Sequence, residues 1–224
     1  MKRNYEMDMC SGPILGKLLT FTIPLIFSGI LQLLFNAADV IVVGRFAGSQ
    51  SLAAVGSTTA LINLMINIFI GLSVGVNVIV ARYYGAKREK DVQDTIHTAM
   101  ALSIVSGLFL IIVGQLLSRP MLELMGTPDD VIDKSTIYMR IIFIGMPANM
   151  IYNFGSAILR AVGDTKRPLY FLTAAGVINV VLNLFFVIMF RMDVAGVALA
   201  TAISQAISAF LVIRCLMESE GSLK

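Results

Sequence analysis

Residues 14–43 read ILGKLLTFTIPLIFSGILQLLFNAADVIVV, and this run decides the class of fold. Only Lys17 and Asp39 are charged within it, and its apolar residues are spread around all sides of a helix. A helix of about 20 apolar residues crosses the roughly 30 Å hydrocarbon core of a bilayer. A helix on the surface of a soluble protein would be apolar along one stripe only. We therefore predict that this run spans a membrane.

Five further apolar runs follow, at 59–81, 94–117, 136–159, 169–190 and 194–217. Each is predicted to be a helix, because lipid offers no hydrogen-bond partners to an open backbone and no alternating strand pattern is present. Charged residues make up 14% of the chain, whereas soluble domains contain about 25%. The sequence therefore predicts an all-α membrane protein, with residues 1–224 forming one six-transmembrane-helix bundle, and it excludes a soluble helical bundle.

The basic residues between the runs predict an orientation. If both termini lie on one side of the membrane, 12 of the 17 Lys and Arg residues share that side. The opposite side then holds the other five, Arg45, Arg119, Lys134, Arg140 and Arg191. Because basic residues concentrate on cytoplasmic loops, we predict that the amino and carboxyl termini are both cytoplasmic.

Sequence signals for catalysis, metal binding and nucleic-acid binding are absent. His97 is the single histidine and belongs to no metal-binding pair, and there is no nucleophile elbow or phosphate loop. No basic stripe alternates with aromatic residues, as nucleic-acid binding would favour. Cys10 and Cys215 match no metal spacing, so we expect unpaired thiols. We predict that the chain is not an enzyme, holds no cofactor and binds no nucleic acid.

Asp39 is the one acidic residue in the interior of an apolar run, since Asp94 only begins the run at 94–117. At helical steps of four, four and three residues, it completes a polar stripe formed by Ser28, Gln32, Asn36 and Asp39. Placing a carboxylate at bilayer depth costs about 3 kcal/mol or more, so such a group should face a cavity or a partner. The stripe predicts a functional site. The alternative is a structural carboxylate held by a hydrogen bond between helices.

Four other spans carry polar stripes. They are Asn63 and Asn67; Asn149, Asn153 and Ser156 in line with Arg160; Asn179 and Asn183; and Thr201, Ser204, Gln205 and Ser208. For the second and fourth spans we expect contacts between helices. The fifth and sixth spans, taken with Asp39, supply a carboxylate, amide carbonyls and hydroxyls. These hard oxygen ligands suit an alkali cation, and the carboxylate can instead hold a proton, which favours an exchange of ions for another ligand.

Glycines and prolines predict where helices approach and where they bend. Gly71 and Gly75 form a GxxxG pattern, at which we expect two helices to pack closely. Pro24 and Pro147 lie inside apolar runs, and each removes one backbone hydrogen bond. Each is therefore a candidate kink, either a hinge or a static bend.

Two stretches of the chain resemble the multidrug and toxic compound extrusion (MATE) family. The first helix and following loop of that family are similar to residues 24–56, PLIFSGILQLLFNAADVIVVGRFAGSQSLAAVG. The family's loop between helices four and five is similar to residues 160–168, RAVGDTKRP. The order of a helix-one Asp, a helix-five Asn-x-x-x-Asn and a helix-six Thr also resembles the amino-terminal lobe of bacterial and archaeal members.

The resemblance implies one lobe of a MATE-type transporter of the MOP superfamily. Such a transporter expels amphipathic, often cationic compounds in exchange for Na⁺ or H⁺. The implied coupling-ion site comprises Asp39, Asn179, Asn183 and Thr201, with Gln32, Asn36 and Gln205 as cavity-lining candidates and Pro24 as a hinge candidate. Many members with a well-defined cation site have a second carboxylate where this chain has Asn183. The loss of that negative charge should weaken cation binding here.

The resemblance also implies a second lobe, because the family has twelve helices in two lobes related by a parallel repeat. We expect that lobe to be either the missing carboxyl-terminal half of a longer protein or a second copy in a homodimer. The expected location is the plasma membrane of a bacterium or archaeon, with lipids and small amphipathic or cationic substrates as partners. Two alternatives stay open. One is a flippase for lipid-linked saccharides, which an Arg- or Lys-rich cavity would favour, and the other is a non-transporting membrane scaffold subunit.

Overall fold

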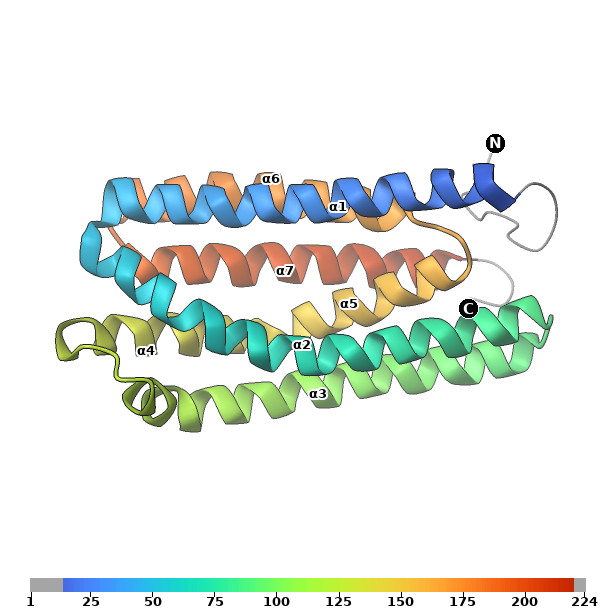
Figure 1. The fold of residues 1–224 in the computed structure, drawn as a ribbon, viewed down its shortest axis with the longest axis horizontal. Helices are drawn as coiled ribbons and strands as arrows, with labels where there is room; N and C mark the ends of the chain where they lie inside the picture. The colour runs from blue at the N-terminus through green and yellow to red at the C-terminus, as the bar shows by residue number, and fades with distance from the viewer. Residues whose placement is uncertain (1–13, 220–224) are drawn as a thin grey trace.

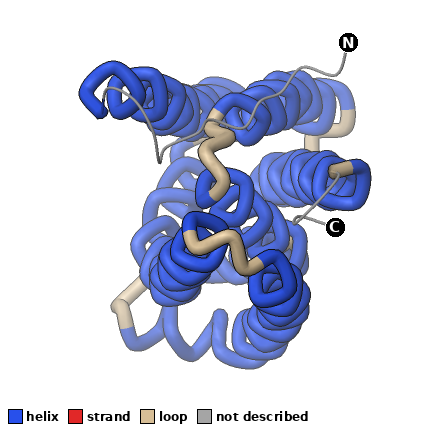
Figure 2. Tube along the Cα trace, turned by 90° about the vertical axis from the view of Figure 1, so that its right-hand side faces the viewer, coloured by secondary structure: helices blue, strands red, loops and turns tan. Residues whose placement is uncertain are grey.

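The computed structural model describes residues 14–219, which form a bundle of helices running roughly alongside one another (Figure 1). The elements are α1 (Ile14–Val42), the π-helix η1 (Val43–Ala47), α2 (Ser49–Gly85), α3 (Glu89–Leu124), α4 (Asp129–Ile144), α5 (Met146–Ala161), α6 (Lys166–Leu184), the π-helix η2 (Phe185–Met189) and α7 (Asp193–Glu218). Figure 2, turned by 90°, shows that only short loops join the helices.

Five or six membrane spans account for these helices in the described part of the chain. Five are long and apolar enough to cross a bilayer unbroken, and α4 with α5 makes a sixth if the pair is one span bent by 47°. The bend lies beside Pro147, which has no N–H to donate and whose ring excludes the carbonyl one turn earlier. The Gly145 N–H bonds to the Ile142 carbonyl at 3.0 Å, in a tightened turn. In contrast, α1 continues through Pro24 as a single helix.

The helices extend further than the apolar runs predict. The stretches between the predicted runs, 82–93 and 118–135, shrink to links of residues 86–88 and 125–128. Helix α2 begins ten residues before the predicted 59, directly after Gly48, which has a φ of 87°. Hydropathy marks where lipid ends, whereas a helix continues into water if its termini are stabilised. Glu89 and Asp91 lie in the first turn of α3, where negative charge is favourable. At about 1.5 Å per residue, α2 is longer than the hydrocarbon core is thick.

Helices pack closely around α3 and α5, at glycines that carry no obvious motif. A Cβ added at Gly107 would lie 2.3 Å from the Pro147 Cα, and one at Gly155 would lie 2.1 Å from the Val212 Cγ1. No atom of the described chain lies within 4 Å of a Cβ built at Gly71 or Gly75. The predicted close approach at this GxxxG pattern is therefore wrong within the described residues.

The first and last described helices begin and end at the same end of the bundle. Figure 1 shows the start of α1 and the end of α7 at the end that also holds the α2–α3 and α5–α6 turns. An even number of spans requires this arrangement. The chain termini and Cys10 lie outside the described residues. Cys215 is a buried free thiol.

Candidate functional site

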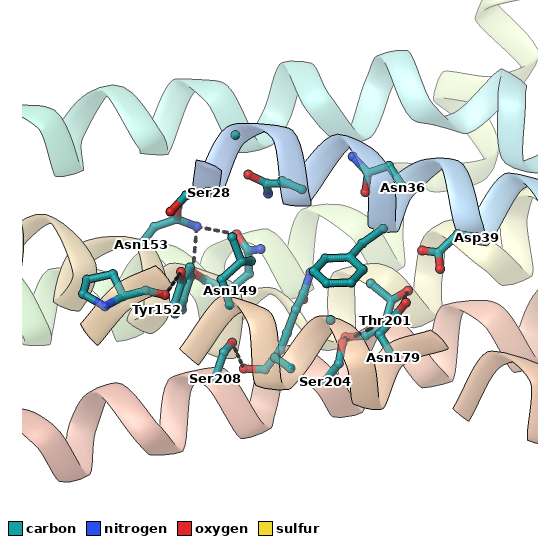
Figure 3. Close-up of a pocket in the computed structure, with 18 of the residues that line it drawn as sticks. Ser28, Asn36, Asp39, Asn149, Tyr152, Asn153, Asn179, Thr201, Ser204 and Ser208 are labelled. Carbon is teal, nitrogen blue, oxygen red and sulfur yellow. Dashed lines mark hydrogen bonds between the residues drawn. The ribbon is translucent and has the colours of Figure 1, made fainter. Parts of the chain in front are cut away.

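A cavity of about 360 Å³ lies between α1, α5, α6 and α7. The whole polar stripe of α1 lies in its wall, comprising Ser28, Gln32, Asn36 and Asp39. Figure 3 shows Ser28 toward one end of the cavity and Asp39 toward the other. The opposite walls are polar as well, because the facing stripes of α5, α6 and α7 turn toward the same space. Polar stripes from four helices therefore meet around one hollow within an apolar bundle.

Asp39 and three nearby residues form one hydrogen-bonded chain across α1, α6 and α7. The Asn183 Nδ2 donates to the Asp39 Oδ1 and also to the Asn179 Oδ1, the latter at 3.2 Å. The Asn179 Nδ2 donates in turn to the Thr201 Oγ1 at 3.2 Å. Asn179 and Asn183 are 5% and 0% exposed. The four residues implied by the resemblance to share one site are thus brought together by three different helices.

An oxygen in this chain of contacts has no hydrogen-bond donor. Because Asn183 donates both of its bonds through Nδ2, its Oδ1 is left buried and without a partner in the described residues. Buried acceptors in native proteins are nearly always satisfied, so such an oxygen calls for an explanation. It sits on the side chain that contacts the Asp39 carboxylate. The Asp39 carboxylate, a ligand suited to a small hard cation, therefore lines the cavity, whereas Asn183 contacts it from a buried position that does not line the cavity.

The stripe of the fourth span also lies in the cavity wall, which corrects the expectation that it joins helices. Asn149, Asn153 and Arg160, all on α5, line the cavity. The Asn153 Nδ2 donates to the Asn149 carbonyl at 2.8 Å and to the Asn149 Oδ1 at 2.9 Å, both within α5. Polar residues at helical spacing share a face, but spacing alone does not say what that face meets.

Tyr152 and Arg160 are among the cavity residues that were not predicted as members of the site. Tyr152 lines the cavity, and its hydroxyl donates to the Pro168 carbonyl at 3.1 Å, which ties α5 to the first turn of α6. Arg160 was recognised only as continuing the α5 stripe. Its position in that stripe was the signal that could have placed it in the cavity. Gln205, by contrast, was a cavity-lining candidate, and it lies in the wall on α7.

Comparison with known proteins adds to this geometry. Residues 24–185 match the MatE family model. The chain belongs to the MATE family. MATE proteins are membrane transporters, which agrees with the prediction that the chain is not an enzyme.

The fold of one MATE lobe is confirmed by relatives and solved structures. The chain is 35% identical over 197 residues to the probable multidrug resistance protein YoeA of Bacillus subtilis (strain 168), a match covering 86% of this chain and 42% of that protein. Crystal structures of MATE in the bent and straight conformations give TM-scores of 0.85 and 0.84, each at 26% identity over 90% of this chain and 45% of theirs. The chain spans about half the length of these MATE relatives.

Proposed function

We propose that this chain is one lobe of an ion-coupled exporter, in which Asp39 binds Na⁺ or H⁺ in exchange for an amphipathic, often cationic substrate. The proposed location is the plasma membrane of a bacterium or archaeon, with both chain termini in the cytoplasm. The observation that carries the proposal is the position of Asp39, in the wall of a cavity and in contact with Asn183 of α6.

Charge balance in the cavity supports an exchange. Asp39 is the one acidic residue in the cavity wall formed by the described chain. An unpaired carboxylate in the membrane is costly, so it favours a proton, a metal cation or a cationic substrate. Because the site has a single formal negative charge, these ligands compete for it. Asn183, which donates its Nδ2 to the Asp39 carboxylate, adds no second negative charge, and a single charge suits a monovalent cation.

The exposed face of α2 supports a second lobe. Asn63, Asn67, Gly71 and Gly75 follow one another at steps of four residues, and all four are exposed on the described bundle. An asparagine facing lipid would leave its amide without hydrogen-bond partners, whereas small and polar residues are common where membrane helices pack. We propose that another lobe covers this face, supplied either by a continuation of the chain or by a second copy.

The first helix has the features of a moving element. α1 packs mainly against α6, and Pro24 leaves one carbonyl of the preceding turn without its helical hydrogen bond. Bending at Pro24 would therefore break fewer hydrogen bonds than bending elsewhere. Since Asp39 lies on the same helix, we propose that α1 bends at Pro24 when the ligand of Asp39 changes.

The two rival functions receive less support. A flippase for lipid-linked saccharides would favour a cavity rich in arginine or lysine, whereas this wall carries Arg160 as its one basic residue in the described chain. In a scaffold subunit the polar stripes would face neighbouring helices. Here the stripes of four helices face a shared cavity.

The test is efflux of the cationic dye ethidium from proteoliposomes that contain the two-lobed protein, under an imposed Na⁺ or H⁺ gradient. Asp39→Asn keeps the size of the side chain but removes its charge, so we expect gradient-driven efflux to be lost. The matched control is Asp130→Asn, in the exposed first turn of α4, which should behave as wild type. The gradient that drives wild-type efflux identifies the ion. Unchanged efflux in Asp39→Asn would remove Asp39 from coupling, and a wild type without gradient-dependent efflux would favour the scaffold.

A further inference from the structure

Arg160 is a charged residue of the cavity that the proposed coupling reaction does not use. It lies in the last turn of α5 and lines the same cavity as Asp39. Figure 3 shows Tyr152 and Asn153 of α5 at the end of the cavity away from Asp39. Arg160 follows them by about two helical turns. The cavity therefore has a carboxylate toward one end and a guanidinium toward the other.

No carboxylate neutralises Arg160 within the described chain. No ion pair among residues 14–219 includes it. Asp164, the acid nearest in sequence, is fully buried and accepts hydrogen bonds from other residues. Its Oδ1 accepts the N–H groups of Lys166 and Arg167, each at 3.1 Å, and its Oδ2 accepts the Arg167 Nε. Asp39 is the only acid in the described cavity wall, and it lies toward the other end.

The helix supplies only part of what a guanidinium needs. A positive charge near a helix C-terminus is favourable, which lets Arg160 stay in place without a counterion. A guanidinium nevertheless has five N–H donors in a planar fork, which matches the two oxygens of a carboxylate or phosphate. Half-buried in a cavity wall, an unpaired guanidinium is well placed to receive such a group from a molecule entering the cavity.

We propose that Arg160 binds an oxyanion, a carboxylate or phosphate, carried by the transported molecule. The cavity then accepts zwitterionic amphiphiles lengthwise, with the cationic group toward Asp39 and the anionic group at Arg160. The cavity volume of about 360 Å³ lies in the range of small-molecule sites. This assignment rests on the proposed function, because it names the substrate class of the same cavity.

The test uses two fluorescent dyes that differ only at one carboxyl group. Rhodamine 110 has a free carboxylate, and rhodamine 123 is its methyl ester. Binding to the two-lobed protein in nanodiscs is measured by fluorescence polarisation without any ion gradient. Arg160→Gln should weaken rhodamine 110 binding about tenfold or more, the loss expected for a hydrogen-bonded charged group. Rhodamine 123 binding should stay unchanged.

Two further variants separate charge recognition from folding. Arg160→Lys keeps the positive charge but loses the planar fork, so its affinity for rhodamine 110 should fall between those of wild type and Arg160→Gln. Arg140→Gln is the matched control, because Arg140 is exposed, belongs to the same bent span and does not line the cavity. It should bind both dyes as wild type does.

Several results would overturn the assignment. One is that Arg160→Gln weakens the binding of both dyes equally. Another is that rhodamine 110 binding is unchanged in that variant, and a third is that the wild type fails to bind rhodamine 110. The coupling proposal stands or falls separately. If Asp39→Asn still couples efflux to a gradient while Arg160→Gln discriminates the two dyes, the substrate assignment survives and the coupling site does not.

Discussion

Helices α5 and α1 both line the cavity, but the bundle holds them in different ways. α5 packs against α2, α3 and α7, and glycines bring it close to α3 and α7. α1 has α6 as its main neighbour. Only 6% of the most apolar stretch of the α1 span is buried, against 44% for α7. Both charged residues of the cavity therefore face the same space, but Arg160 stands on a fixed wall and Asp39 on a wall with few neighbours. A helix with one main neighbour can move without disrupting the core of the bundle.

The largest effect on the free energy of unfolding is expected where α5 packs against α3. Gly107→Ala would place a Cβ 2.3 Å from the Pro147 backbone, which cannot rotate away as a side chain can. We expect the free energy of unfolding to fall by about 3 kcal/mol, at the upper end of the overpacking range. The measurement is the unfolding midpoint in mixed micelles titrated with SDS.

Gly71→Ala is the control for that substitution when both variants of this lobe are unfolded without a second lobe, because nothing outside its own helix in the described chain lies within 4 Å of its added Cβ. Alanine in a helix interior is favoured over glycine by up to about 1 kcal/mol, so this variant should be as stable as wild type or slightly more so. Similar midpoints for Gly107→Ala and Gly71→Ala would show that α3 and α5 are not locked together.

A smaller effect is expected where α1 meets α6. Gly176→Ala would bring a Cβ to 1.9 Å from the Phe35 Cε2, at the far end of a side chain that can turn. Because the ring or α1 itself can shift, we expect a loss of about 1 kcal/mol in the same titration. Phe35→Leu should restore most of it, as a double-mutant cycle would show. A loss as large as that of Gly107→Ala would mean that α1 is held as firmly as α5.

The smallest effect on the lobe itself is expected at the exposed stripe of α2. Asn67→Leu should change the free energy of unfolding of the lobe by less than about 0.5 kcal/mol, because Asn67 is exposed in the described bundle. Gradient-driven ethidium efflux should nevertheless fall, since the proposed contact with a second lobe is lost. The exposed neighbour Ile68 supplies the control, as Ile68→Leu should leave both measurements unchanged. Unaltered efflux in Asn67→Leu would place the second lobe elsewhere.

The spans and the candidate ion ligands could be predicted because each depends on local pattern. Asp39 stands out as a charge within an apolar run, and the steps from Ser28 to Asp39 place these residues on one helical face without any knowledge of other helices. The stripe on α5 has the same regular spacing. It was expected to face another helix, whereas it lines the cavity, because spacing defines a face and not its neighbour.

Close packing was harder to predict for a related reason. Gly71 and Gly75 match a known pattern yet meet nothing in the described chain, whereas Gly107 and Gly155 match none and lie against other helices. The space at a glycine is set by where a distant helix crosses it. That crossing depends in turn on the bend at Gly145 and on every other contact in the bundle.

The amino-acid sequence by itself determined that this protein is helical, lies in a membrane and carries a carboxylate where lipid would otherwise surround it. Burying an open backbone or a lone charge in hydrocarbon is so costly that composition and order suffice for these conclusions. Only the tertiary structure decided that Asn183 contacts Asp39, that the α5 stripe and Arg160 share the cavity, and that α1 has one main neighbour. These are relations between residues far apart in the chain, and their energies depend on distances that exist only once the helices have packed.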